Sequence, residues 1–138
     1  MAQVPTRAER RAILDYHNQV REKVQPPASN MKLLRYSVKL EKLAMQWAVQ
    51  CRWEHPDPER YTQYENIGQN LALRNGSKPS FTQMATGWYN EVVNYTYHSN
   101  KCSHVCGHYT QVGLYILSVH SLDYLIASRQ DCYLLHIN

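Results

Sequence analysis

The segment from Ser37 to Cys51 constrains the fold more than any other part of this sequence, because its apolar residues recur at the spacing of an α-helix. Ser37 is a residue type favoured at helix N-caps. The apolar positions form one broad stripe: Leu40, Leu43, Ala44, Trp47, Ala48 and Cys51. A stripe of this width needs another layer of structure to cover it. We therefore expect this helix to anchor a packed core.

Two further helices are predicted, one on each side of this segment. Residues 8–24 place Ile13, His17, Val20 and Val24 at helical spacing, and two prolines then end the pattern. Residues 81–95 carry one line through Met84, Trp88, Glu91 and Tyr95 and a second through Ala85, Tyr89 and Val92. Residues 54–80 are rich in proline and glycine and are expected to form loops around a short apolar piece near Ile67 and Leu71.

Strand-like segments follow the helices. Residues 108–117, 122–127 and 132–137 are rich in Tyr, Val, Ile and Leu, a composition typical of β-strands. Helices followed by strands predict an α+β arrangement. A length of 138 residues is enough for one compact domain and short for two.

Composition narrows the possible partners and the compartment. The formal net charge is +4, but the basic residues are scattered, which does not favour nucleic acid binding. No apolar run reaches the roughly 18 residues that a membrane-spanning helix needs. Four cysteines and two N-x-S/T sequons, at Asn75 and Asn94, indicate an oxidising, glycosylating compartment. The first residues lack the apolar core of a secretory signal, so we expect an incomplete or alternative start.

Three residues far apart in the chain are candidates for chemistry. Glu91 shares a helical face with Trp88, which places a carboxylate at the edge of the core, where it needs a partner. Pro56 holds His55 in extended backbone. Together with His108, these residues could supply two imidazoles and one carboxylate to a weak Zn²⁺ site with open positions. The alternative is that both histidines are simply hydrogen-bonded core or surface residues.

Covalent catalysis has less support. The sequence contains no G-x-S-x-G turn, and cysteines in an oxidising compartment are expected to be paired.

Five stretches, in order, resemble the successive signatures of the CAP superfamily of cysteine-rich secretory proteins, insect venom allergens and plant pathogenesis-related class 1 proteins. They are LDYHNQVR (14–21), QWAVQCRWEHPD (46–57), YENIGQNLA (64–72), GWYNEVVNY (87–95) and CGHYTQV (106–112). The resemblance implies an extracellular α-β-α sandwich with a central antiparallel sheet, whose domain here is residues 8–112.

The same resemblance implies a cleft formed by two histidines and two acidic residues. By position these are His55, His108 and Glu91, with Gln69 where many relatives carry a glutamate. It also implies a weakly bound divalent ion, Zn²⁺ or Mg²⁺, held by His55 and His108. A glutamine can neither act as a base nor supply a negative charge, so Gln69 weakens any hydrolytic mechanism.

The tail, residues 113–138, does not match the family pattern that normally completes the sheet. We expect an alternative exon or a shifted reading frame, with a divergent but folded ending as the alternative. Cys102 and Cys106 are expected to form a disulfide, because their spacing can reach disulfide geometry in a turn and plant relatives carry a bond there. Cys132 is then the intramolecular candidate for Cys51.

Three functions remain open at this point. The first is an extracellular, non-catalytic module that binds a lipid, a sterol or an extracellular protein, as the resemblance implies for most of the family. The second is a metal-dependent peptidase that uses the histidines and Glu91. The third is a non-functional truncated isoform. We favour the first.

Overall fold

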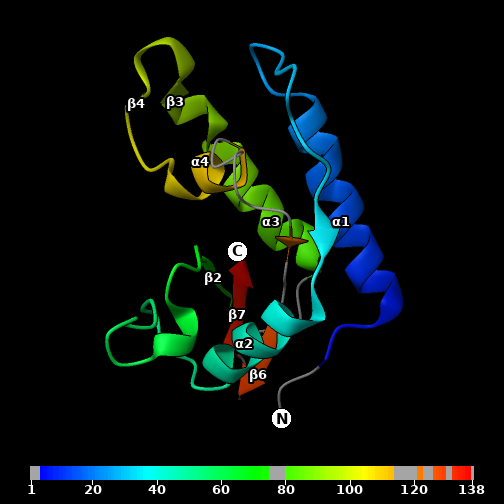
Figure 1. Ribbon diagram of the computed structural model, residues 1–138, viewed down its shortest axis with the longest axis vertical. Helices are drawn as coiled ribbons and strands as arrows, with labels where there is room; N and C mark the ends of the chain where they lie inside the picture. The colour runs from blue at the N-terminus through cyan, green and yellow to red at the C-terminus, as the bar shows by residue number, and fades with distance from the viewer. Residues whose placement is uncertain (1–3, 75–79, 114–120, 123–125, 130–131, 138) are drawn as a thin grey trace.

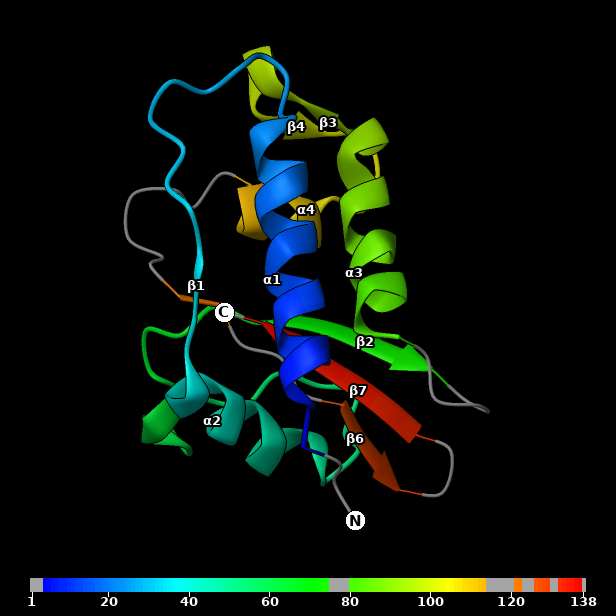
Figure 2. The same cartoon turned by 90° about the vertical axis from the view of Figure 1, so that its right-hand side faces the viewer.

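The computed structural model describes residues 4–74, 80–113, 121–122, 126–129 and 132–137. Helices α1 (Arg7–Glu22) and α3 (Phe81–Tyr89) run side by side over one face of a small sheet, and α2 (Val38–Ala48) lies on the other face (Figures 1 and 2). The sheet consists of β2 (Asn70–Arg74), β7 (Cys132–Ile137) and β6 (Ile126–Arg129). This layering confirms the predicted α+β fold of α-β-α type with an antiparallel sheet.

The order of the strands places β7 at the centre of the sheet. It pairs antiparallel with β2, from Asn70 opposite Ile137 to Arg74 opposite Tyr133, and antiparallel with β6 on its other edge. Strand β7 matches the predicted segment 132–137. The segment 113–138 therefore contributes two of the three strands of this sheet, and α2 packs against both.

Two small strand pairs complete the described strands. Strand β1 (Arg35–Tyr36) pairs parallel with β5 (Ser121–Leu122), and β3 (Tyr95–Thr96) pairs antiparallel with β4 (Lys101–Cys102). The predicted strand 122–127 thus overlaps β5 and β6, and its residues 123–125 lie outside the described residues.

The three predicted helices begin at side-chain caps. Ser37 Oγ accepts a hydrogen bond from the backbone N–H of Leu40, as its position in the sequence predicts. Thr6 with Glu9 and Ser80 with Gln83 form capping boxes at α1 and α3. Because these caps satisfy backbone donors that the helices leave unpaired, the starting points are set locally.

Two predicted elements differ from the structure. The third helix is α-helical only to Tyr89, after which a 3₁₀ helix, η2 (Asn90–Asn94), continues it. The strand predicted for residues 108–117 is wrong over 108–113, because Gly107–Gly113 form the helix α4. Its residues 114–117 lie outside the described residues. The side chain of Glu91 accepts hydrogen bonds at the start of α4, so a distant residue overrides the local preference for a strand.

The loop between α2 and β2 is largely irregular, as expected. It contains one 3₁₀ turn, η1 (Thr62–Tyr64), and a second such turn, η3 (Tyr97–Ser99), joins β3 to β4. Across the described ranges, no helix has the length and apolar character needed to cross a membrane.

The core consists of two clusters on opposite faces of the sheet. One lies between α1 and α3 and contains Ile13, Leu34, Phe81, Met84, Ala85 and Trp88; the other lies under α2 and contains Ala44, Trp47, Ala48, Tyr64 and Leu71. Leu71 belongs to the α2 cluster and its neighbour Ala72 packs on the other. Alternate residues of β2 therefore join the two faces, as the pleat of a strand requires.

A buried carboxylate joins the first two helices. Glu41 on α2 accepts two hydrogen bonds of 2.7 Å from the Arg10 guanidinium on α1 and another from the Tyr36 hydroxyl. Burial alone would raise the pKa of Glu41, but the hydrogen bonds from Arg10 and Tyr36 outweigh it, and the pKa lies below its usual value. No local pattern in the sequence marks Glu41 as buried, so this contact could not be predicted from the sequence.

Candidate functional site

His55 lies on the loop that leaves α2, next to a residue that is tied to the core. The indole Nε1 of Trp47 donates a 2.8 Å hydrogen bond to the carbonyl of Glu54, which fixes the backbone beside His55. The imidazole Nδ1 of His55 then donates to Oε1 of Gln69 at 3.0 Å. Since Gln69 directly precedes β2, this pair joins the loop to the sheet. The His55 side chain is exposed.

Glu91 and His108 form the second pair. Oε1 of Glu91 accepts a 2.7 Å hydrogen bond from Nδ1 of His108, and Oε2 accepts from the backbone N–H groups of His108 and Tyr109 at 3.0 and 3.2 Å. The His108 ring stacks on Trp88 with 5.8 Å between ring centroids. The two paired side chains are 15% and 27% exposed, respectively. Glu91 therefore both caps α4 and orients the imidazole.

Asn70 connects the two pairs. Its side chain is 1% exposed, and Nδ2 donates a 3.0 Å hydrogen bond to the carbonyl of His108. Asn70 follows Gln69 directly in the chain. The start of β2 therefore contacts the backbone of His108 and lies next to the residue that is hydrogen-bonded to His55. The structure thus brings His55 to Gln69 and Glu91 to His108, and Asn70 links the two pairs.

The role of Glu91 in the structure differs from the metal ligand that the sequence allowed. Glu91 is not placed as a third metal ligand, because its two carboxylate oxygens accept three hydrogen bonds from His108 and Tyr109. Within the described residues, no group of three or more His, Cys, Asp or Glu side chains is placed to hold a metal ion.

A disulfide lies just before α4. Cys102 and Cys106 are bonded, with 5.9 Å between their Cα atoms, which joins the pair predicted from the spacing. Asn94 holds this loop from the other side, because Nδ2 donates to the carbonyl of Val105 and the Asn94 carbonyl accepts from the Ser103 N–H, both at 2.8 Å. The loop of residues 102–106, which leads to His108, is therefore held by the disulfide and by the hydrogen bonds to Asn94.

The remaining predicted modification and disulfide positions are only partly described. Cys51 is disulfide-bonded, and the expected pairing with Cys132 falls on a side chain outside the described part of the structure. The sequon residue Asn75 also lies outside it.

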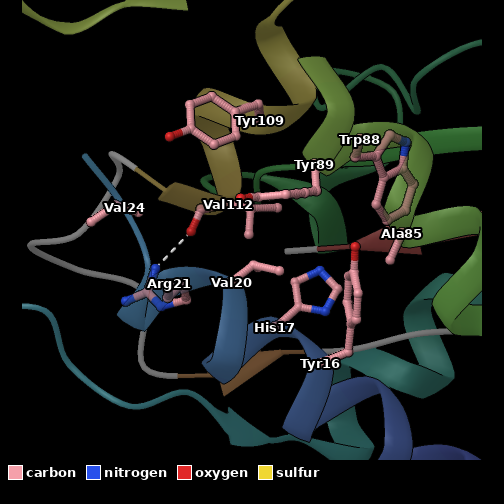
Figure 3. A pocket seen from close by; sticks show the side chains of 10 residues that line it. All are labelled: Tyr16, His17, Val20, Arg21, Val24, Ala85, Trp88, Tyr89, Tyr109 and Val112. Carbon is pink, nitrogen blue, oxygen red and sulfur yellow. Dashed lines mark hydrogen bonds between the residues drawn. The ribbon is translucent and has the colours of Figure 1, made fainter. Parts of the chain in front are cut away.

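A pocket between the helices was not predicted as a site from the sequence. It lies between α1, α3 and α4 and has a volume of about 320 Å³ including its open mouth (Figure 3). Most of its lining is aromatic or aliphatic: Tyr16, Val20, Val24, Ala85, Trp88, Tyr89, Tyr109 and Val112, with His17 and Arg21 beside them. The only hint in the sequence was the helical spacing of the apolar residues in α1. Residues that pack in a solid core have the same spacing, so the pattern does not indicate a pocket.

Two buried polar side chains line this pocket. Nδ1 of His17 donates to the carbonyl of Ile13 at 3.0 Å, and burial lowers the pKa of His17 to about 4. The terminal nitrogens of Arg21 donate to the carbonyls of Val112 at 2.6 Å and Lys32 at 2.8 Å. At neutral pH the pocket therefore contains a neutral imidazole and a guanidinium cation.

The comparisons with known proteins agree with this fold. The model of the family "CAP: Cysteine-rich secretory protein family" matches residues 14–114. Human GLIPR1-like protein 1 is 42% identical over 106 residues, which are 72% of this chain and 43% of the relative. Human Peptidase inhibitor 15 is 40% identical over 111 residues, covering 73% of this chain and 42% of the relative.

Solved structures show the same architecture. Venom allergen-like protein 4 of Schistosoma mansoni superposes with a TM-score of 0.78 at 25% identity, covering 96% of this chain and 88% of that one. NaASP2, solved with Zn²⁺, has a TM-score of 0.79 at 22% identity over 98% of this chain and 80% of that one.

The α-β-α layers and the family match thus define a protein of the CAP class. The chain belongs to the cysteine-rich secretory protein family. It spans less than half the length of the curated relatives that it matches.

Proposed function

We propose that this chain is an extracellular, non-catalytic binding module. The state of Glu91 carries this proposal. A metal-assisted hydrolysis needs a group that takes a proton from the attacking water, and both oxygens of Glu91 already accept hydrogen bonds from His108 and Tyr109. The other family position for an acid holds Gln69, whose amide has no basic site. Neither of the two family positions for an acid therefore offers a carboxylate that is free of hydrogen bonds to act as this base.

We assign the binding function to the helical pocket and an amphipathic lipid as its ligand. Small-molecule sites in proteins are typically concave, apolar and aromatic, with a few polar groups that orient the ligand. The pocket between α1, α3 and α4 has this character. Extracellular location is supported by the disulfide at Cys102 and by membership in a family described as secretory. The sequons at Asn75 and Asn94 are proposed to carry glycans in that compartment.

Val20→Trp is expected to weaken lipid binding at least about tenfold, because the larger side chain fills the pocket that Val20 lines. The measurement is a fluorescence titration with cis-parinaric acid for an acyl chain and with dehydroergosterol for a sterol. Val49→Trp, at an exposed position at the end of α2, is the matched control and should bind like the parent chain. Equal affinities of the parent and Val20→Trp would contradict the pocket as the lipid site.

A protein ligand is the second candidate, favoured by the relatives named Peptidase inhibitor 15. This reading needs no pocket, since a peptidase would contact an exposed surface. A chain that binds neither probe but lowers the activity of a secreted peptidase in a stoichiometric titration would replace the lipid proposal with this one.

We further propose that the cleft holds Zn²⁺ weakly through Nε2 of His55 and His108. In both residues Nδ1–H is donated to a side-chain oxygen, so the lone pair lies on Nε2. This matches the usual support of metal-bound histidine, in which the second ring nitrogen donates to a carboxylate or carbonyl. Two donors are fewer than the three or four of ordinary zinc sites, so affinity is expected to be low. Imidazole donors favour Zn²⁺ over Mg²⁺.

His55→Ala and His108→Ala are each expected to abolish the heat of Zn²⁺ binding that the parent chain gives in calorimetric titration at pH 7.5. His98→Ala, on the exposed turn η3, should keep the parent heat. Equal heats from all four chains would show that the ion binds elsewhere.

A further inference from the structure

Three large apolar side chains are exposed around the β3–β4 pair, at the end of the molecule opposite α2 (Figure 2). Val93 is 83% exposed, Tyr97 is 51% exposed and Val105 is 68% exposed. Val93 and Tyr97 lie on either side of β3 in the chain, and Val105 follows β4. We call these three residues the hairpin patch. A group of exposed apolar side chains on a protein surface commonly marks a place that another group covers.

Asn94 lies among the residues of this patch. It follows Val93 directly in the chain, and its Nδ2 atom donates to the carbonyl of Val105 at 2.8 Å. The Asn94 carbonyl accepts hydrogen bonds from the N–H and the hydroxyl of Ser103, at 2.8 and 3.3 Å. These three hydrogen bonds hold both the backbone and the side chain of Asn94 against the loop of residues 102–106. The position of Nδ2 beside Val105 is therefore set by the fold.

The same Nδ2 atom is the acceptor atom of a glycosylation sequon, formed by Asn94, Tyr95 and Thr96. An asparagine amide carries two hydrogens, and the bond to Val105 uses one of them. The other hydrogen can be replaced by a sugar, and the Asn94 side chain is partly exposed. A glycan on this atom would begin within the hairpin patch.

We propose that an N-linked glycan at Asn94 covers the hairpin patch, with its first N-acetylglucosamine residues packed on Val93, Tyr97 and Val105. The oligosaccharide comes from a lipid pyrophosphate donor: the bond between sugar C1 and the pyrophosphate oxygen breaks, a bond between C1 and Nδ2 forms, and Nδ2 loses one proton. The C–H faces of the sugar rings cover the apolar side chains, and the hydroxyl groups remain in water. The inference rests on the extracellular location in the proposed function and adds what the glycan does to the surface.

The first test is the occupancy of Asn94 in the parent chain, expressed in cultured animal cells behind a secretory signal peptide. Peptide mapping of the secreted chain should find a glycan on Asn94, and an amidase that removes N-glycans should convert this residue to aspartate. A secreted chain with an unmodified Asn94 would overturn the inference and leave the extracellular function standing. A chain that folds but is retained in the cell in every variant would instead overturn the proposed function, and the inference with it.

The second test compares the parent chain with Thr96→Ala, which removes the sequon and leaves Asn94 in place. The described contacts of Thr96 are made by its backbone, so the variant should keep the fold. Hydroxyl-radical labelling read by mass spectrometry measures the exposure of each side chain. The labelling rates of Val93, Tyr97 and Val105 should be at least about twofold lower in the glycosylated parent, because the sugar removes apolar surface from water.

Two controls make this comparison specific to the patch. Trp53 and Val49, which are 61% and 41% exposed beyond the end of α2, should be labelled at the same rates in both chains. Thr96→Ser keeps a sequon and should restore both the glycan and the protection. Equal rates at the hairpin patch with and without the glycan would show that the sugar points away, and the inference would fail. A uniform fall that includes Trp53 and Val49 would also overturn it, because such shielding is not contact with the patch.

Discussion

Trp47→Ala is expected to lower the free energy of unfolding by about 3–5 kcal/mol, the range for removing a buried tryptophan. The Trp47 side chain is 2% exposed and makes edge-on contacts with Tyr61 and Tyr64, at 5.2 and 6.0 Å between ring centroids. Since a domain of this kind has about 5–15 kcal/mol in total, the loss is a large part of its stability. Chemical denaturation followed by circular dichroism measures it.

Two control substitutions separate the causes of this loss. Trp53→Ala removes a tryptophan that is 61% exposed, so it should change the stability by less than about 0.5 kcal/mol. Trp47→Phe keeps most of the packing but loses the hydrogen bond to the Glu54 carbonyl, and its cost should lie between the other two. A Trp47→Ala chain as stable as Trp53→Ala would contradict the assignment of α2 as the core anchor.

Glu91→Ala is expected to cost about 2–4 kcal/mol, because three hydrogen bonds to one carboxylate are lost together. Two of these bonds cap α4 at the N–H groups of His108 and Tyr109, and the third orients the imidazole. The start of α4 should fray as a result. Hydrogen exchange at the amides of His108 and Tyr109, together with the midpoint of chemical denaturation, measures both effects.

Glu65→Ala is the matched control, since this glutamate is exposed in the loop before β2. Its stability should stay within about 0.5 kcal/mol of the parent. Glu91→Gln keeps one oxygen but replaces the other with an amide that donates, so it should lose part of the same stability. Unchanged amide exchange in Glu91→Ala would show that α4 does not depend on this cap.

The helices were predictable because their signals are local. Ser37 and the apolar stripe behind it occur within fifteen residues, and the structure has its helix there, capped as predicted. The start of α3 is likewise marked by its own capping box. These interactions join residues three or four positions apart, so they are visible in the sequence before any tertiary contact is known.

The prediction for residues 108–113 failed for the opposite reason. Tyr109 and Val112 favour a strand by composition, yet they lie in α4. The helix begins where Glu91, 17 residues earlier, accepts its first backbone N–H groups. The role of Glu91 was missed in the same way, because a carboxylate on an apolar face can bind metal, act as a base or cap a helix. Only the position of its neighbours distinguishes these roles.

The sequence by itself determined the family and the α+β class, because ordered motifs and helical periodicity survive as local patterns. The tertiary structure alone decided how the cleft residues pair, that Glu91 caps α4, and that Arg21 is buried beside a pocket with an unsatisfied nitrogen. The physical reason is that hydrogen-bond partners and burial depend on residues distant in the chain. Arg21 donates to the carbonyl of Val112, 91 positions away, and no pattern around either residue encodes that contact.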